Sequence, residues 1–149
     1  MARQINLERT YAYPPEAVWA AITDSEALSE WLMQTDFRPE VGHKFQFRTK
    51  PGPGFDGIVN GEVLSVEPPH KLVYTWQGGP MKKPTTVTWT LQSVQVDGKA
   101  GTHLAFQQSG FIGFGGLIAQ MILTSGWRGL LKKDLVAYLD ARRSGTALA

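Results

Sequence analysis

The sequence of 149 residues contains no cysteine. This absence excludes disulfide bonds, thiolate metal sites and cysteine nucleophiles. Histidine is nearly as scarce, and His43, His70 and His103 are spaced neither from one another nor from a carboxylate as metal ligands would be. We therefore expect no metal site, and the chain contains no cofactor-binding motif that would indicate a cofactor.

An excess of one charge is also lacking. Charged residues make up 19% of the chain and the net charge is +2, with no concentrated basic arm. This balance predicts no nucleic-acid partner. The N-terminus carries Arg3, Glu8 and Arg9 without the apolar run of a secretory signal, which predicts a cytoplasmic protein.

One long stretch lacks charge altogether. From Thr102 to Trp127 there is no Asp, Glu, Lys or Arg, which is enough length for a membrane span of about 20 residues. The stretch also holds five glycines, three glutamines and a histidine. This composition favours a strand, a loop and a buried helix, so we expect no stable membrane insertion.

The length of the chain predicts one domain over residues 1–149, and we expect an ordered core at about 3–142 and a loose tail at 144–149. Residues 3–11 alternate like a half-buried strand, and two short helices follow, the first with Pro15 in its opening turn and the second with a capping box from Thr23 to Glu26.

The middle of the chain then changes to period-two alternation, and a helix predicted over 115–142 ends it. Short turns between consecutive strands, such as Asp97-Gly98, favour an antiparallel sheet. We expect six strands, with a seventh near Phe37, and an α+β fold.

Several short motifs occur in a fixed order along this pattern: "PPEAVWAAITDSEALSEWL", "PEVGHKFQF", "GEVLSVEPPHKLVYTW", "SGF", and "GW" at the final helix. In these the chain resembles the SRPBCC, or START-like, superfamily, and within it the homologues of the activator of the heat-shock protein 90 ATPase. The resemblance implies a helix-grip fold, in which a curved sheet wraps around a long C-terminal helix and leaves a cavity. It does not imply one activity, since the relatives include lipid carriers, polyketide cyclases and co-chaperone domains.

Aromatic side chains on the apolar faces of the strands are the candidate cavity lining, with three residues of the final helix opposite them. The strand set is Phe45, Phe47, Tyr74, Trp76, Trp89 and Phe106, and the helix set is Ile118, Met121 and Ile122. If the sheet closes on the helix, these residues form only a core. If it curves away, they form the walls of an apolar pocket.

Three further features each have two interpretations. Trp31, with Leu32 and Met33, either stops one end of the cavity or fastens the short helices to the core. The glycine-rich segment around Phe111 and Phe114 is either a mobile apolar lid or a packed loop. Asp134 falls within the apolar stripe of the final helix, where it either meets a pocket group, a ligand or the Tyr138 hydroxyl, or reaches solvent at the helix edge.

The usual catalytic motifs are missing. There is no Gly-x-Ser-x-Gly elbow. The "GPGFDG" of residues 52–57 matches a nucleotide fingerprint in letters only, because prolines flank it and no helix follows. We interpret it as a loop.

These observations favour a binding module that holds a small hydrophobic or amphipathic ligand. An alternative is a polyketide cyclase or dehydrase-like enzyme, for which Tyr74, Asp134 and Arg128 are the only candidate proton-transfer groups. A third, which only the family resemblance implies, is a co-chaperone-like protein-interaction domain that uses the convex sheet face or the loop at Lys82 and Lys83. The sequence indicates no oligomeric state.

Overall fold

A computed structural model describes residues 3–148, with side chains as far as Arg143. Its elements, in chain order, are β1 (Arg3–Tyr11), α1 (Pro15–Thr23), α2 (Ser25–Trp31), β2 (Gln34–Thr35), β3 (Lys44–Arg48), β4 (Ile58–Glu67), β5 (Lys71–Trp76), β6 (Thr85–Val96), β7 (Lys99–Phe111), α3 (Gly113–Gly129), the π-helical turn η1 (Leu130–Asp134) and α4 (Leu135–Leu148).

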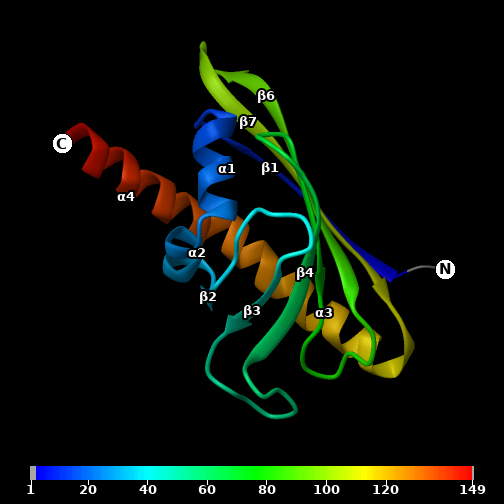
Figure 1. Cartoon of the computed structure of the whole chain (residues 1–149). Coiled ribbons are helices and arrows are strands. Elements are labelled where there is room, and N and C mark those ends of the chain that lie inside the picture. The colour runs from blue at the N-terminus through cyan, green and yellow to red at the C-terminus, as the bar shows by residue number, and fades with distance from the viewer. Residues whose placement is uncertain (1–2, 149) are drawn as a thin grey trace.

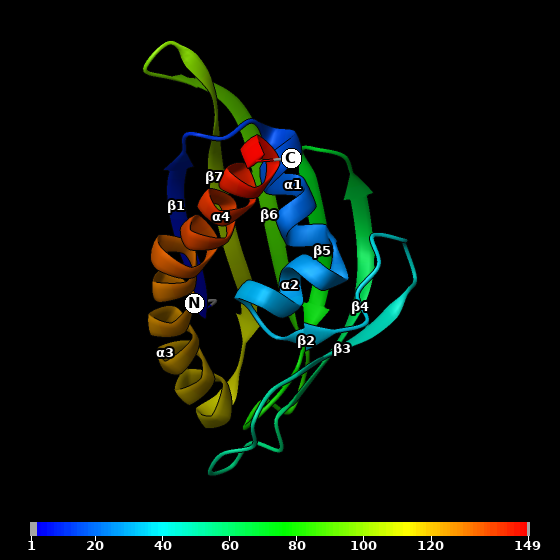
Figure 2. The ribbon, with the colours of Figure 1, turned by 90° about the vertical axis from the view of Figure 1, so that its left-hand side faces the viewer.

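The sheet has seven strands in the order β1-β7-β6-β5-β4-β3-β2, and every neighbouring pair is antiparallel. It curves around the long helix, and α1 and α2 pack on the same concave side (Figure 1, Figure 2). The predicted α+β helix-grip fold is confirmed. The additional strand is β2, which ends two residues before Phe37, the position expected for it.

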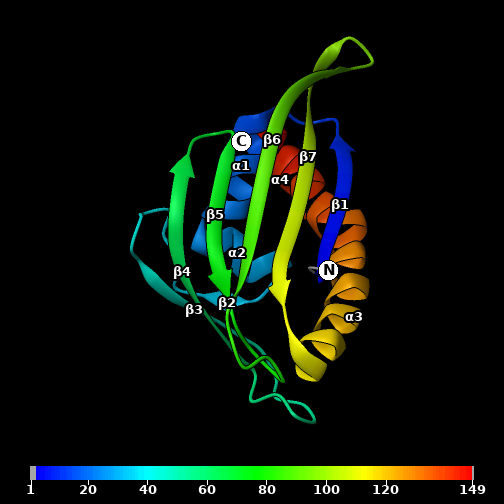
Figure 3. The same cartoon turned by 90° about the vertical axis from the view of Figure 1, so that its right-hand side faces the viewer.

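Alternation of side chains decides which face of each strand is buried. In β6, Val87, Trp89 and Leu91 are buried while the threonines between them point outward. The hairpin to β7 turns at Asp97 and Gly98, both with positive φ, as a two-residue hairpin of the type I′ class requires. The outer face of the sheet carries no described helix (Figure 3).

The short helices begin as their sequences predict, with one correction. Pro15 occupies the first turn of α1. The side chain that caps α2 is Asp24, which accepts a 3.0 Å hydrogen bond from the backbone N–H of Ala27. Thr23 was expected in this role, but its hydroxyl donates to the Trp19 carbonyl of α1 instead.

The long helix is continuous from α3 to α4 but contains a π-helical turn, which the sequence pattern did not predict. Its buried residues Trp127, Leu131, Leu135 and Leu139 follow a strict four-residue spacing. In a pure α-helix this spacing drifts by about 40° a step, so the wider turn of η1 helps to keep the row facing the sheet. The Tyr11 hydroxyl of β1 donates a 2.7 Å hydrogen bond to the Leu131 carbonyl within that turn.

Helix α4 continues to Leu148, over most of the segment for which we expected a loose tail. The side chains of residues 144–148 and all of residue 149 lie outside the described part of the chain.

Candidate functional site

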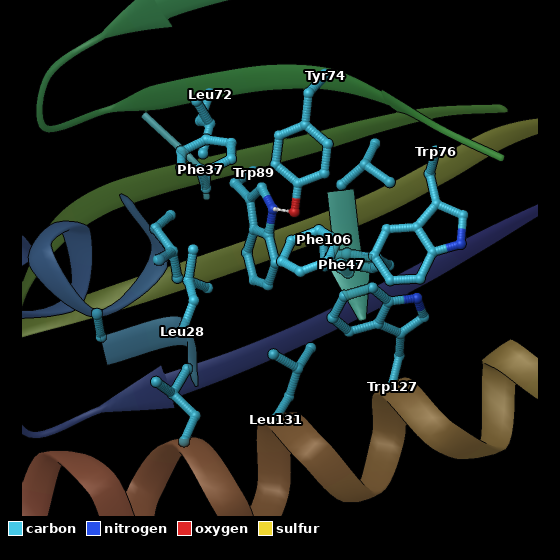
Figure 4. Packing of buried hydrophobic residues seen from close by; sticks show 14 of the residues in the cluster. Leu28, Phe37, Phe47, Leu72, Tyr74, Trp76, Trp89, Phe106, Trp127 and Leu131 are labelled. Atoms are coloured by element: carbon cyan, nitrogen blue, oxygen red, sulfur yellow. Dashed lines mark hydrogen bonds between the residues drawn. The ribbon is translucent and has the colours of Figure 1, made fainter. Parts of the chain in front are cut away.

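The space between sheet and helix is filled by aromatic rings, to which the helix contributes Trp127 (Figure 4). The Trp127 ring centroid lies 4.4 Å from that of Phe106, 5.2 Å from that of Trp76 and 5.7 Å from that of Trp89. A second group joins Phe45 to Phe37 at 4.9 Å and to Tyr74 at 5.2 Å. The strand aromatics predicted as cavity walls therefore pack against one another and against the helix as a core.

The polar atoms in this core are paired. Trp127 Nε1 donates to Gln108 Oε1 at 3.0 Å, and Gln108 Nε2 donates to the Thr85 hydroxyl at 2.8 Å. Trp89 Nε1 donates to the Tyr74 hydroxyl at 3.0 Å. Among the described side chains no buried nitrogen or oxygen lacks a partner. The core thus presents no free polar group to a ligand.

The helix residues expected opposite the strand aromatics lie elsewhere, which corrects that expectation. Met121 and Ile122 are 66% and 64% exposed, and Ile118 is half-buried. The physical reason is the four-residue row of the long helix, which turns Trp127 and Leu131 inward. Trp127, which the sequence analysis placed only in the helix stripe, takes the central position.

An apolar pocket opens at one end of this core, with a volume of about 200 Å³. It lies where the β3–β4 connection and the β5–β6 connection meet α3. These two connections and the start of α3 are at the lower end of the ribbon in Figure 2. The residues that line it are Met33, Pro53, Gly54, Phe55, Val59, Trp76, Gly78, Gly79, Pro80, Met81, Ala119, Ile122 and Leu123. None has a charged side chain, so the pocket suits an apolar group.

Glycines allow the loops to approach the helix this closely. A Cβ atom at Gly115 of α3 would lie 2.2 Å from the Pro80 carbonyl oxygen. Gly79, beside that proline, has a φ of +59°, which glycine adopts without strain. The β5–β6 connection can therefore rest directly on the start of α3 and close one side of the pocket.

Of the residues predicted to bind ligand, Trp76 and Ile122 line this pocket. Trp31 is buried at the end of α2, where its Nε1 donates to the Ala21 carbonyl of α1 at 2.8 Å and fastens the two helices together. Phe111 is the last residue of β7 and is buried against Gly116, whereas Phe114, in the first turn of α3, is 78% exposed. The glycine-rich segment is thus the junction of a strand and a helix rather than a loop.

The sequence analysis missed most of the pocket. Phe55 and Met81 come from two loops, "PGPGF" and "GGPM", that share a signal: a single apolar residue follows a run of glycine and proline. Met33 had been singled out with Trp31, but only as part of a cluster.

The groups proposed for catalysis do not meet. Tyr74 is fully buried, and burial raises the pKa of its hydroxyl well above the ordinary value. Asp134 and Arg128 are exposed on the long helix, so the solvent-facing interpretation of Asp134 holds. None of the three lines the apolar pocket.

The described residues contain no group of three or more histidines or carboxylates able to hold a metal ion. They also contain no helix that is long and apolar enough to span a bilayer.

A larger hollow of about 370 Å³ lies between α1 and α4, bordered by Tyr13, Tyr138, Arg142 and Arg143. The Arg143 guanidinium lies 5.6 Å from the centroid of the Tyr13 ring, and the Tyr13 hydroxyl bonds to Asp140. Two of the bordering side chains, Tyr13 and Arg143, are thus engaged with each other, which leaves the apolar pocket as the stronger candidate site.

Comparison with known proteins agrees with the fold. A family model described as Activator of Hsp90 ATPase homolog 1-like protein matches residues 12–140. Protein MLL2253 of Mesorhizobium loti is 34% identical, with a TM-score of 0.78 over 93% of this chain and 98% of its own. Among curated protein sequences, none matches this chain.

Two other solved structures are similar. DynU16, described as a putative protein in the dynemicin biosynthetic locus, is 25% identical with a TM-score of 0.71, over 92% of this chain and 47% of DynU16. PFC0360w of Plasmodium falciparum, described as an HSP90 activator, is 26% identical with a TM-score of 0.58, over 70% of this chain and 71% of its own. On the family match and the helix-grip architecture together, this chain belongs to the Activator of Hsp90 ATPase homolog 1-like family of the SRPBCC superfamily.

Proposed function

We propose that the protein is a binding module that holds the apolar part of a small hydrophobic or amphipathic molecule in the pocket between α3 and the two loops. The proposal rests on the lining of this pocket, which consists of apolar side chains, prolines and glycines and contains no charged group. Val59, Trp76 and Ala119 of this lining are buried. We take the protein to be cytoplasmic, as its sequence predicts.

The size of the pocket narrows the ligand class. A dry cavity of about 150 Å³ accepts benzene, whereas sites for drug-sized ligands enclose about 300 to 1,000 Å³. A pocket of about 200 Å³ lies between these limits. We therefore expect it to take one aromatic ring or a short alkyl chain, with any polar part of the ligand outside the mouth.

A pocket-filling variant tests this proposal. Ala119→Phe places a ring inside the pocket, and Ala137→Phe adds the same ring at an exposed position of α4. Calorimetric titration with a panel of alkylbenzenes and short fatty acids should detect binding to the parent protein and to Ala137→Phe, and a loss of at least about tenfold in Ala119→Phe.

Met33→Trp fills the pocket from another of its lining positions and so provides a second test in case the first variant misfolds. Each variant should keep the circular dichroism spectrum of the parent. The proposal would be contradicted if the parent protein bound none of these ligands, or if both filled variants bound them as strongly as the parent does.

We also propose, as a second candidate, that the protein contacts a chaperone of the Hsp90 class. The support is the family description and the similarity to a protein described as an HSP90 activator. A pull-down with the chaperone of the host tests it, with Lys82→Glu and Lys83→Glu to examine the basic loop. No retention of the chaperone would count against this candidate.

A further inference from the structure

The first half of α3 presents large apolar side chains to solvent. Phe114 is 78% exposed, and Met121 and Ile122 follow it at seven and eight positions further along the helix, which places them on one face. Ile112, just before the helix, is also exposed. We call these four residues the α3 strip.

Exposed apolar residues of this size are rare elsewhere on the molecule. Among the described side chains only Val41 and Leu64 share the property, and they lie apart from α3. A contiguous exposed apolar patch usually marks an interaction site. We therefore expect the α3 strip to be covered by a binding partner.

Positive charge surrounds the strip. Lys82 and Lys83 are exposed in the β5–β6 connection, whose Pro80 packs directly on Gly115 at the start of α3. The Arg3 guanidinium donates a 2.7 Å hydrogen bond to the Gly113 carbonyl, at the first residue of α3. These three cations flank an uncharged helix face.

Negative charge is concentrated elsewhere. The segment of residues 102–127 has no charged residue, and the carboxylate among the pocket loops is that of Asp56, which accepts from the Ile58 N–H. In contrast, α1, α2 and the capping residue between them carry Glu16, Asp24, Glu26 and Glu30 and no Lys or Arg. The segments around the strip thus carry more cations than carboxylates.

An apolar helix face bordered by lysines is complementary to an anionic lipid bilayer, because the side chains enter the acyl boundary while the lysines meet the headgroups. A second copy of the chain fits less well, since a two-fold contact through the strip would bring the lysines of both copies together. We propose that the α3 strip, with Lys82 and Lys83, docks the protein on the surface of an anionic membrane.

The strip is continuous with the apolar pocket, because Ile122 belongs to both. A docked molecule would hold the pocket mouth against the bilayer, so that an apolar ligand could pass between the two without crossing water. This consequence rests on the proposed ligand binding, whereas docking itself does not.

Co-sedimentation with lipid vesicles tests the docking. We expect binding to an equal mixture of phosphatidylcholine and phosphatidylglycerol, and little binding to phosphatidylcholine alone. Lys82→Gln with Lys83→Gln should weaken binding by about 25-fold, since each lysine near an anionic surface contributes about fivefold. Phe114→Gln with Met121→Gln should weaken it at least as much.

Matched controls change the same residue types elsewhere. Lys71→Gln with Lys99→Gln changes the first residues of β5 and β7, two strands that start at the end of the sheet opposite to the start of α3 (Figure 3). Val41→Gln with Leu64→Gln removes the other exposed apolar residues of the described chain. Both pairs should bind vesicles like the parent. Absence of binding to the anionic vesicles, or equal losses in the control pairs, would overturn the proposal.

Two other results separate the alternatives. If the parent protein is a dimer in size-exclusion chromatography, if Phe114→Gln makes it a monomer, and if neither binds vesicles, then the α3 strip binds a second copy of the chain instead of a membrane. Ala119→Phe should lose ligand binding but keep vesicle binding, because Ala119 lines the pocket and is not part of the α3 strip. This variant therefore tests the pocket separately from membrane docking.

Discussion

Trp127 of the long helix packs on Phe106 of β7 with ring centroids 4.4 Å apart. This contact lies between sheet and helix, where the family resemblance implied a cavity, and here it joins helix to sheet. It explains why the open volume lies at the end of the core, beside Trp76, rather than in the middle. The contact also makes Trp127 the residue on which the packing between helix and sheet depends most.

Trp127→Ala should lower the free energy of unfolding by about 3 to 5 kcal/mol, because it leaves a large cavity in a packed core. Trp127→Phe keeps a ring but leaves Gln108 Oε1 without its donor, for a cost of about 1 to 3 kcal/mol. Urea unfolding measures both values. A loss below about 1 kcal/mol in Trp127→Ala would contradict the central position of this ring.

The cap of α2 gives a second prediction. Asp24→Ala removes the acceptor of the Ala27 N–H and should cost about 1 kcal/mol. Glu26→Ala, which would break a capping box begun by Thr23, should change stability by less than about 0.5 kcal/mol. If Asp24→Ala and Glu26→Ala lowered the free energy of unfolding equally, the capping box would be supported instead.

The buried tyrosines predict a loss of stability in alkali. Burial raises the pKa values of Tyr11 and Tyr74 above the ordinary value of 10.0, so the folded protein keeps both protons when the unfolded chain has lost them. Their contribution is fully present below about pH 10 and declines as the pH rises above it toward their folded-state pKa values, by up to about 1.4 kcal/mol per pH unit for each tyrosine.

Urea unfolding at pH values from about 8 to about 11 measures this slope. Tyr74→Phe should make it shallower, whatever its effect at neutral pH, whereas Tyr13→Phe, at a half-buried tyrosine, should change it less. A slope that is unchanged in Tyr74→Phe would contradict the raised pKa of that hydroxyl.

Much of the fold follows from the sequence, because it depends on periodicities that short segments carry by themselves. The alternation of Val87, Trp89 and Leu91 fixed the buried face of β6, and Asp97-Gly98 fixed its turn. The π-helical turn was missed, because it arises from the need of Trp127 and Leu139 to face the same sheet over a long helix rather than from any local propensity.

The candidate site was far less predictable. Alternation predicted that the strand aromatics point inward. It could not show whether they form the walls of a pocket or a packed core, because that depends on Trp127, which reaches them from the long helix. Phe55 and Met81 belong to loops, whose positions depend on tertiary contacts such as that between Gly115 and Pro80. Only Trp76 and Ile122 were predicted to bind ligand and line the pocket.

The exposure of Asp134 makes it a test of the enzyme alternative. Asp134→Leu should change the free energy of unfolding by less than about 0.5 kcal/mol and leave ligand affinity unchanged, because the carboxylate faces solvent. Calorimetric titration of the variant checks this result. A loss of ligand binding would return Asp134 to the site.

The most direct test of the pocket uses the methionines, of which the chain has four. Met33 and Met81 line the pocket, whereas Met121 lies on the exposed α3 strip. In a protein labelled with ¹³C at the methionine methyl groups, titration with toluene should shift the Met33 and Met81 signals saturably and leave the Met121 signal nearly unmoved. Shifts that do not saturate, or that are as large at Met121 as at Met33 and Met81, would contradict the pocket as the binding site.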